Sequence, residues 1–472
     1  MSRFSDYCKY LIKENGTNVH QISKNTTLDC TTLQRMVTGK RVPSREFVEK
    51  FCSYLRISET EKKGLIELFL IEQLGETSYY SYKYIKEMFC QLYNLEQNPN
   101  ESSFQIDFSQ TFINPLAYQK ISISVENLIF SILSECFHKP HKTHIYTNLP
   151  SGSNFLRNVE IMVNKNKNKV HIMHLIYFYL NGIDNLSNLT SLLTVLPYAL
   201  SPYLDYNPYF IYTHLNYAEF QNTMFPFYLI TDQKVLLLSG DLQNCVIIDD
   251  PTQIQQYIEQ FHLSIQQSHV LIHKTDILSE AFTFYSNALP EKKTSFYGIE
   301  YQLCFTNLFK KEDFHQVVQT LMPNLRSSIP LIDSLFTLEK EFFYTKEGID
   351  SFFQSGKFYG QAATILPPLS KPYIINIFEQ YLHSKQSDHC HMIKDSIHMP
   401  RYINFEINEN PQLNIIQIID SSVFQLLTIE EPTICDAFNN FFNILQNSEE
   451  IYSVDESKSY IKKKINDLKK SF

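Results

Sequence analysis

Five short stretches of apolar residues at helical spacing fill the first 75 residues of this 472-residue chain. They span residues 2–14, 19–25, 30–38, 44–55 and 59–74. Asn18, Asp29 and Ser58 are placed to cap the helices that follow them. Gly16 and Gly39 are placed to end the helices that precede them. The pattern predicts a small all-helical bundle at the N-terminus.

Charge is unevenly distributed along the chain. Residues 1–56 contain ten Lys and Arg against five Asp and Glu, a balance of +5, whereas the remaining residues carry 31 basic and 45 acidic side chains, a balance of -14. A basic segment attached to an acidic body is typical of a module that binds a polyanion.

Three motifs follow one another in the basic segment. They are Val19-x-x-Ile22-Ser23, then Leu28-x-x-Thr31-x-Leu33-x-x-Met36, then Gly39-Lys40-Arg41-x-Pro43-Ser44. In this order they resemble the Cro and lambda-repressor type of helix-turn-helix, also called the XRE family, over residues 3–70. Ser23 departs from the family's usual Ala, and Asn25-Thr26-Thr27 stands where the family often has Gly in the turn.

The resemblance implies that the helix after Asp29 enters the major groove of DNA, where all four base pairs can be distinguished. It assigns the base contacts to the outward positions Cys30, Thr31, Gln34 and Arg35. Gln34 suits adenine and Arg35 suits guanine, because each side chain can form two hydrogen bonds with that base. The expected phosphate contacts are Asn18, Lys24, Lys40, Arg41 and Arg45.

The pattern after residue 75 changes to a helical connector and then to alternating strands and helices. The segment 94–103 is polar, contains Pro99 and is typical of a linker. An order of hairpin, strand, acidic residues, Pro and helix occurs at 227–261 and again at 402–442, and Ile145–Leu149 resembles Cys304–Leu308. Either the body is duplicated, or a common strand–turn–strand–helix order recurs by chance.

The sequence therefore predicts an α+β protein: an all-α helix-turn-helix bundle followed by a large mixed α/β body, with pseudo-duplication as one interpretation. The expected segments are the helix-turn-helix domain 1–75, a connector and linker 76–103, regulatory subdomains 104–290 and 291–448, and a basic C-terminal helix 449–472. In that last helix Ile461, Ile465 and Leu468 share one face. We expect this face to dock on the body; contact with a membrane surface or a nucleic acid is the alternative.

Motifs of familiar catalytic sites are absent from the sequence. It has no glycine-rich phosphate loop, no G-x-S-x-G and no H-E-x-x-H, so we expect no enzyme activity, no cofactor and no metal. Two groups of ligand-type residues leave metal binding open as an alternative to exposed loop histidines. The first group is Cys136, His138, His141, His144, His171 and His174, and the second is His383, Asp388, His389, Cys390, His391 and His398.

The nine cysteines are scattered without any C-x-x-C pair, and neither a signal peptide nor a long apolar run is evident. We therefore expect reduced thiols, a cytoplasmic protein and no membrane partner.

The function that the sequence favours is transcriptional regulation through sequence-specific binding of double-stranded DNA. The expected partners are DNA, a second copy of the chain, and an unknown small-molecule or protein effector of the body. Two alternatives stay open. One is an effector or enzyme of unrecognised chemistry with an autoregulatory DNA-binding head, and the other is a scaffold whose helical head docks proteins.

Overall fold

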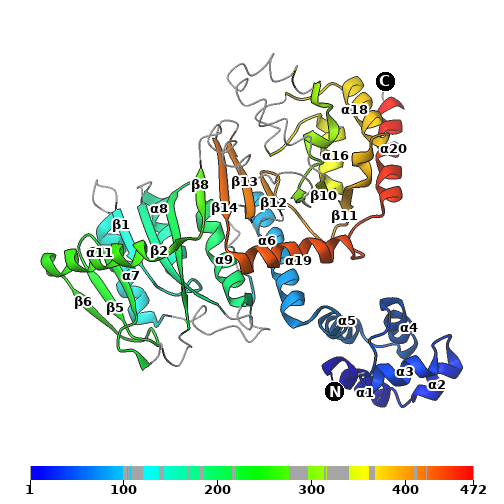
Figure 1. Ribbon diagram of the computed structural model, residues 1–472, viewed down its shortest axis with the longest axis horizontal. Helices are drawn as coiled ribbons and strands as arrows, with labels where there is room; N and C mark the ends of the chain where they lie inside the picture. The colour runs from blue at the N-terminus through cyan, green and yellow to red at the C-terminus, as the bar shows by residue number, and fades with distance from the viewer. Residues whose placement is uncertain are drawn as a thin grey trace. The chain divides into compact units, whose positions relative to one another are not determined.

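The computed structural model divides into two compact units, Met1–Lys83 and Tyr84–Phe472 (Figure 1). The residues that it describes are 2–98, 104, 106–108, 121–137, 143–166, 170–180, 185–214, 219, 222–275, 296–312, 315, 340–360, 367–408, 412–420 and 423–470.

The first unit is a helical bundle whose helices lie where the sequence predicts them. They are α1 (Arg3–Glu14), α2 (Val19–Asn25), α3 (Cys30–Val37), α4 (Arg45–Leu55) and α5 (Glu59–Leu74), followed by the start of α6 (Glu76–Gln97). Helices α1 to α4, of 12 residues or fewer, are too short to be stable alone, so burial of one apolar face against their neighbours stabilises them. The shared core includes Phe4, Leu11, Ile22, Leu33, Met36, Phe51 and Leu65.

The turn between α2 and α3 forms without glycine. Thr26 has a φ of -135°, so the backbone stays in the extended region that any residue adopts. Its hydroxyl donates to the carbonyl of Ile22 (2.7 Å) and accepts from the amide of Leu28 (3.1 Å). This side chain satisfies backbone groups that the end of α2 leaves open, so the turn forms without a glycine.

Helix α6 passes from the first unit into the second. In the second unit Tyr84, Ile85, Met88 and Phe89 are buried, and the ring of Phe89 lies 4.9 Å from that of Phe405 and 5.5 Å from that of Phe441. The helix continues to Gln97, so residues 94–97 are not part of a linker as we expected, and 99–103 lie outside the described residues. The boundary between the compact units falls inside α6 because its second half supplies core side chains to the body.

Two mixed sheets of seven strands form the body. The first has the order β6-β5-β4-β1-β2-β3-β7 and the second β11-β10-β9-β12-β13-β14-β8. The strands of the first are β1 (Thr143–Thr147), β2 (Val170–Tyr179), β3 (Leu204–Thr213), β4 (Phe227–Thr231), β5 (Val235–Leu238), β6 (Cys245–Ile248) and β7 (His269–Val270). Those of the second are β8 (His273–Thr275), β9 (Phe296–Glu300), β10 (Lys340–Thr345), β11 (Cys390–Ile393), β12 (Ile403–Asn408), β13 (Gln412–Asp420) and β14 (Val423–Ile429).

The two sheets repeat one topology. In the first, β1, β2 and β3 are parallel, and β4, β5 and β6 extend the sheet antiparallel from the far side of β1. In the second, β9, β10 and β11 are parallel, and β12, β13 and β14 extend it in the same way from β9. The body is therefore pseudo-duplicated, with β1–β6 equivalent to β9–β14.

The helix that follows each repeat begins with the same signal. Asp250-Pro251-Thr252 opens α11 (Pro251–Gln266), and Glu431-Pro432-Thr433 opens α19 (Pro432–Gln446). Each acidic side chain accepts a hydrogen bond from the helix backbone, at 2.9 and 2.8 Å, and each proline occupies the first turn, where its missing N–H costs nothing.

The other suggested match between the halves is wrong. Ile145 to Thr147 lies in strand β1, whereas Phe305–Leu308 forms the short helix α13, and the strand equivalent to β1 is β9. Both segments contain Thr-Asn-Leu, but the first leaves a strand and the second lies within a helix, so the likeness is one of letters and not of place in the fold.

Helices cover the sheets. The first sheet packs against α11, and against α9 (Asn185–Leu200) at β2 and β3; the helices α7 (Ile123–Phe137) and α8 (Phe155–Asn166) pack on each other. In the second sheet, Phe342 and Tyr344 face α16 (Lys346–Ser355), α18 (Lys371–Leu382) and α20 (Val454–Lys470). Phe343 alternates to the opposite face and stacks on Phe442 of α19.

The C-terminal helix docks as expected. Ile461, Ile465 and Leu468 of α20 are buried in the core of the second sheet. Within the residues that the structure describes, none of the helices combines the length and the apolar character needed to cross a bilayer.

Candidate nucleic-acid interface

Helix α3 presents two different faces. Leu33 and Met36, three residues apart, are fully buried in the bundle core, and this contact fixes the rotation of the helix about its axis. Thr31, Gln34 and Arg35 consequently lie on the opposite face and are exposed. Three of the four side chains predicted to contact bases are therefore accessible to a large partner.

Cys30, the fourth predicted base contact, lies differently. Its side chain is only half-exposed, and its Sγ lies 3.5 Å from Nδ1 of His20 on α2. His20 is exposed and was not among the predicted residues. Because a histidine on one short helix and a cysteine ten residues later share no sequence motif, only the packing of α2 beside α3 reveals this contact.

Asp29 determines where α3 begins. Its carboxylate accepts a 2.6 Å hydrogen bond from the backbone amide of Thr32, and hydrogen bonds with Thr32 lower the pKa of Asp29 below its ordinary value. The positive charges of Arg35 and Arg41 lower this pKa further. The cap therefore stays ionised at neutral pH, close to two of the cations that we expect to contact DNA.

The predicted phosphate contacts fall into two groups. Lys24, Lys40 and Arg41 are exposed, and Gly39 ends α3 with a φ of +71°, a conformation that glycine adopts without strain. Asn18 is exposed, but its side chain accepts from the amide of Gln21 (3.0 Å) and so caps α2. Arg45 is half-exposed, and its Nε donates to Glu49 on the same helix (3.1 Å), so a phosphate would have to compete with this carboxylate.

The described residues of the first group of ligand-type residues are not arranged to hold a metal ion, although the rings of His144 and His171 lie 5.4 Å apart. His174 is fully buried on β2 and is not an exposed loop histidine. Burial lowers its pKa to about 4, so the ring is neutral. Its Nε2 donates to the carbonyl of Leu149 (2.7 Å) and its Nδ1 accepts from the hydroxyl of Tyr206 (2.8 Å). His138 and His141 lie outside the described residues.

Two members of the second group, His389 and His391, meet at a carboxylate. Glu341 of β10 accepts from Nδ1 of His389 and from Nε2 of His391, each at 2.7 Å, and these contacts help to lower the pKa of Glu341. Cys390 is buried, and His398 stacks on Tyr93. Across the described parts of the chain, no three His, Cys, Asp or Glu side chains are arranged to hold a metal ion.

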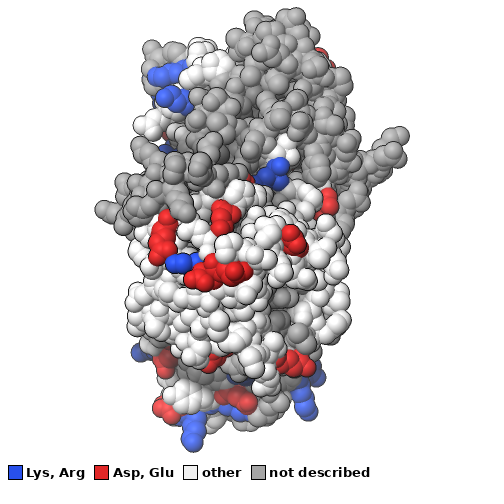
Figure 2. Space-filling model, turned by 90° about the vertical axis from the view of Figure 1, so that its left-hand side faces the viewer, with Lys and Arg blue, Asp and Glu red and all other residues white. Residues whose placement is uncertain are grey.

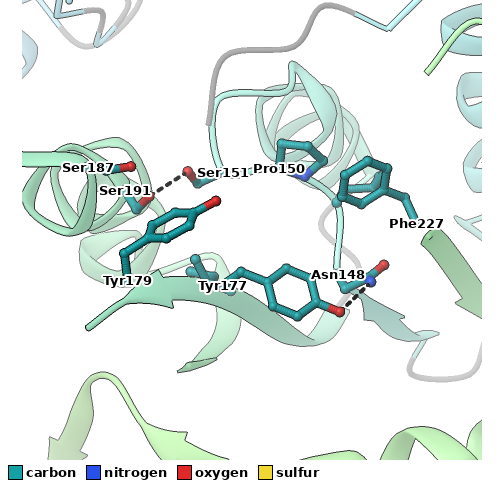
Figure 3. A pocket seen from close by; sticks show the side chains of 10 residues that line it. Asn148, Pro150, Ser151, Tyr177, Tyr179, Ser187, Ser191 and Phe227 are labelled. Atoms are coloured by element: carbon teal, nitrogen blue, oxygen red, sulfur yellow. Dashed lines mark hydrogen bonds between the residues drawn. The ribbon is translucent and has the colours of Figure 1, made fainter. Parts of the chain in front are cut away.

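A small cavity lies at the carboxyl ends of β1 and β2 (Figure 3). Tyr177 and Tyr179 of β2, Asn148 after β1, and Ser187 and Ser191 of α9 line it, together with Leu149, Pro150, Ser151, Ile176 and Phe227. Asn148 donates to the hydroxyl of Tyr177 (3.2 Å), and Ser151 donates to Ser191 (3.3 Å). The cavity measures about 30 Å³, room for a water molecule but not for an effector.

A larger opening of about 250 Å³ lies at the carboxyl ends of β10 and β11 in the second sheet. Thr345, Lys346, Glu347, Asp350, Ile393, Lys394, Asp395, Ile397 and His398 line it. Glu347 is held by Tyr93, Tyr301 and Arg401, and Asp350 by Lys464 and Tyr460. Sequence motifs did not indicate this site, but its place at the carboxyl ends of parallel strands is where α/β sheets commonly bind ligands.

Comparisons with known proteins do not place the chain in a family. No family model matches it, and no curated protein does. Among solved structures, a polyphosphate kinase from Porphyromonas gingivalis matches with a TM-score of 0.23 and 10% identity over 72% of this chain. The phosphatidylserine synthase of Haemophilus influenzae Rd KW20 matches with a TM-score of 0.25 and 11% identity over 73% of this chain and 90% of its own. The chain spans about half, 54%, of the polyphosphate kinase. Likeness at this level carries no argument about function.

Proposed function

We propose that this protein is a sequence-specific DNA-binding regulator, in which the first unit reads DNA as an XRE-like helix-turn-helix and the body regulates that binding. The observation that carries the proposal is the division of α3 into a buried and an exposed face. Leu33 and Met36 hold the helix in place, and Thr31, Gln34 and Arg35 are left for base edges.

Charge supports the same assignment. Lys24, Lys40 and Arg41 are exposed on the unit that carries α3, and residues 1–56 hold an excess of five positive charges in a chain whose net charge is -9. Cations that meet phosphates release bound counterions, and this release supplies much of the affinity of DNA-binding modules.

The body is proposed to respond to an effector and not to catalyse a reaction. The opening at the ends of β10 and β11 is the larger of the two that we describe. It combines lysines and carboxylates from the start of α16 and from the segment after β11 with one histidine of that segment. A small polar molecule would fit this volume better than the cavity beside β1, which holds about one water.

The proposal is tested with the full chain and genomic DNA fragments. The chain should bind preferentially to fragments with specific sequences, and its affinity for them should fall steeply between about 50 and 200 mM salt. Lys40→Ala combined with Arg41→Ala should weaken binding to every sequence and reduce the logarithmic salt slope by about 2. Gln34→Ala should instead change the preferred sequence, by about tenfold or more at one base pair.

Lys62→Ala combined with Lys63→Ala is the matched control. It removes the same charge from α5 of the same unit and should leave both the affinity and the sequence preference near wild type. If the two double variants weaken binding equally, only net charge matters. If the wild-type chain binds no duplex at low salt, the helical unit is a docking module and the proposal is wrong.

A further inference from the structure

Among the described residues, strand β6 is an unpaired edge of the first sheet. It ends the first sheet beyond β5, and its residues Cys245–Ile248 include neither a charged side chain nor a proline. Val246 and Ile247 are 42% and 45% exposed. Natural proteins normally place lysines, prolines or bulges on such edges, because an open edge of neutral residues pairs readily with another strand.

The second repeat shows how this position is used within the same molecule. Its equivalent strand, β14, is paired on both sides: with β13 on one side and antiparallel with β8 on the other. The strand β8 comes from the chain segment that follows α11 of the first repeat, so it seals the second sheet. Among the described residues nothing seals β6 in the same way.

The surface beside β6 is neutral over part of its area, with the exposed carboxylates of Asp241, Asp249 and Asp250 close to the strand in sequence. Figure 2 looks onto this side of the molecule and shows an expanse free of Lys, Arg, Asp and Glu, with acidic side chains grouped along part of its border. Helix α11, which follows β6, has one charged residue among its sixteen, Glu259. Half of its ten exposed positions are Gln, and Leu263 is also exposed. A depletion of charged residues at the centre of a surface patch is typical of protein–protein interfaces.

We propose that β6 pairs antiparallel with β6 of a second copy of this chain, which joins two first sheets across a two-fold axis. A neutral strand is suited to meet itself in this way, because no like charges face each other along it. Because residues directly opposite each other in an antiparallel pair lie on the same face of the sheet, a two-fold axis perpendicular to the sheet places one residue opposite its own copy. When the axis passes between the two Ile247 residues, Val246 of one copy lies opposite Ile248 of the other and Asp249 lies opposite Cys245, so no like charges meet. The axis is perpendicular to the sheet, so both α11 helices lie on the same face of the joined sheet.

The choice of a second copy as the partner rests on the proposed function, since one reader contacts few base pairs and two readers can recognise a pair of half-sites. The pairing mode itself rests on β6 and its comparison with β14.

The first experiment measures the mass of the full chain by sedimentation velocity at micromolar concentrations. Wild type should form a reversible dimer. Ile247→Lys should be a monomer, because it places two like charges beside each other across the axis. Val270→Lys is the matched control: Val270 lies on β7 at the opposite edge of the same sheet and is 39% exposed, and this variant should dimerise as wild type does. Circular dichroism checks that both variants are folded.

The second experiment uses the native cysteine of β6. In the pairing described, the two Cys245 residues lie about 14 Å apart, from an offset of four residues at a rise of ~3.3 Å per residue and a strand spacing of ~4.8 Å. A bis-maleimide of that length should cross-link wild type into a dimer, and Cys245→Ser should abolish the product. Cys30→Ser and Cys90→Ser, which remove the other two partly exposed thiols, should leave it unchanged.

A monomeric wild type, or a dimer that survives Ile247→Lys and is not cross-linked through Cys245, overturns the pairing. DNA-binding measurements distinguish a failure of the β6 pairing from a failure of the proposed DNA-binding function. The Ile247→Lys monomer should keep its affinity for a single half-site and lose about tenfold or more of the affinity for two half-sites. A dimer through β6 that binds no DNA would leave the pairing standing and remove the proposed function.

Discussion

The two sheets of the body share one strand order and differ in what their equivalent positions carry. Where β2 of the first sheet borders β3, His171 donates to Asp205 at 2.8 Å. Where β10 of the second borders β11, the carboxylate of Glu341 is on the inner strand, and it accepts from His391 of the outer strand and from His389, which directly precedes that strand. The backbone arrangement has been kept while the polar partners have changed places.

The ends of the two sheets differ in the same manner. The carboxyl ends of β1 and β2 close on a cavity of about 30 Å³, whereas those of β10 and β11 leave about 250 Å³ lined by charged side chains. The outer edge of β14 is sealed by β8, and that of β6 is open among the described residues. One topology thus supports a closed and an open version of the same features, so side chains and not strand order determine what each half can bind.

The largest expected difference between the two sheets is in how much one histidine of each contributes to the free energy of unfolding. His174→Ala in the first sheet should lower the free energy of unfolding by about 4 kcal/mol, because it opens a cavity and leaves the Leu149 carbonyl and the Tyr206 hydroxyl without their partner. His389→Ala in the second should cost less than about 1 kcal/mol, because its side chain is more than half exposed. Urea unfolding with hydrogen exchange resolved by peptide would assign each loss to its sheet. Equal losses would contradict the comparison.

The same histidine should make the first sheet acid-sensitive. Unfolded, His174 takes up a proton near pH 6.5; folded, it does so only near pH 4. Between these values the unfolded state binds more protons, so stability falls as pH falls, by about 3 kcal/mol in total. The pKa of Glu341 is lowered, so its contribution is present above its ordinary value of 4.5 and is lost below it. As the pH is lowered, amide hydrogen exchange in β2 should therefore begin to accelerate at a higher pH than amide hydrogen exchange in β10. His174→Gln should remove this difference in onset pH between the two strands.

The equivalent helix caps should differ by a smaller amount. Glu431→Ala should cost about 2 kcal/mol, because this buried carboxylate caps α19 and also accepts from Thr433 and from Tyr212 of the first repeat. Asp250→Ala removes only the exposed cap of α11 and should cost about 1 kcal/mol. Thermal melts of the two variants provide the measurement, and a larger loss for Asp250→Ala would reverse the interpretation.

The smallest effect concerns the carboxylate between two histidines. Glu341→Gln keeps the shape of the side chain and removes its charge, so it should lower the free energy of unfolding by about 1 kcal/mol. The loss is no larger because the glutamine can still accept a hydrogen bond and the site is partly exposed. The loss should vanish at low pH, where the wild-type carboxyl is itself protonated. Denaturation at neutral and at acidic pH would show whether it persists.

Local signals were sufficient to predict the first unit. Asn18, Asp29 and Ser58 cap the helices that the sequence assigned to them, because a cap and its backbone donor lie within three residues of each other. The exposed and buried faces of α3 followed from the spacing of Leu33 and Met36. The pairing of Arg45 with Glu49 and the contact of Cys30 with His20 were not foreseen, because they depend on rotamers and on how two helices pack.

By itself the sequence determined the helices of the first unit, the strands and helices within 227–261 and 402–442, the repeated acid-Pro-Thr helix starts and the outward face of α3. All of these arise from neighbours a few residues apart. The tertiary structure alone decided that β8 seals β14 and not β6, that His174 is buried, and that Glu341 meets two histidines about fifty residues away. These contacts join segments distant in sequence, and their energy comes from burial and pairing that exist only once both sheets have formed.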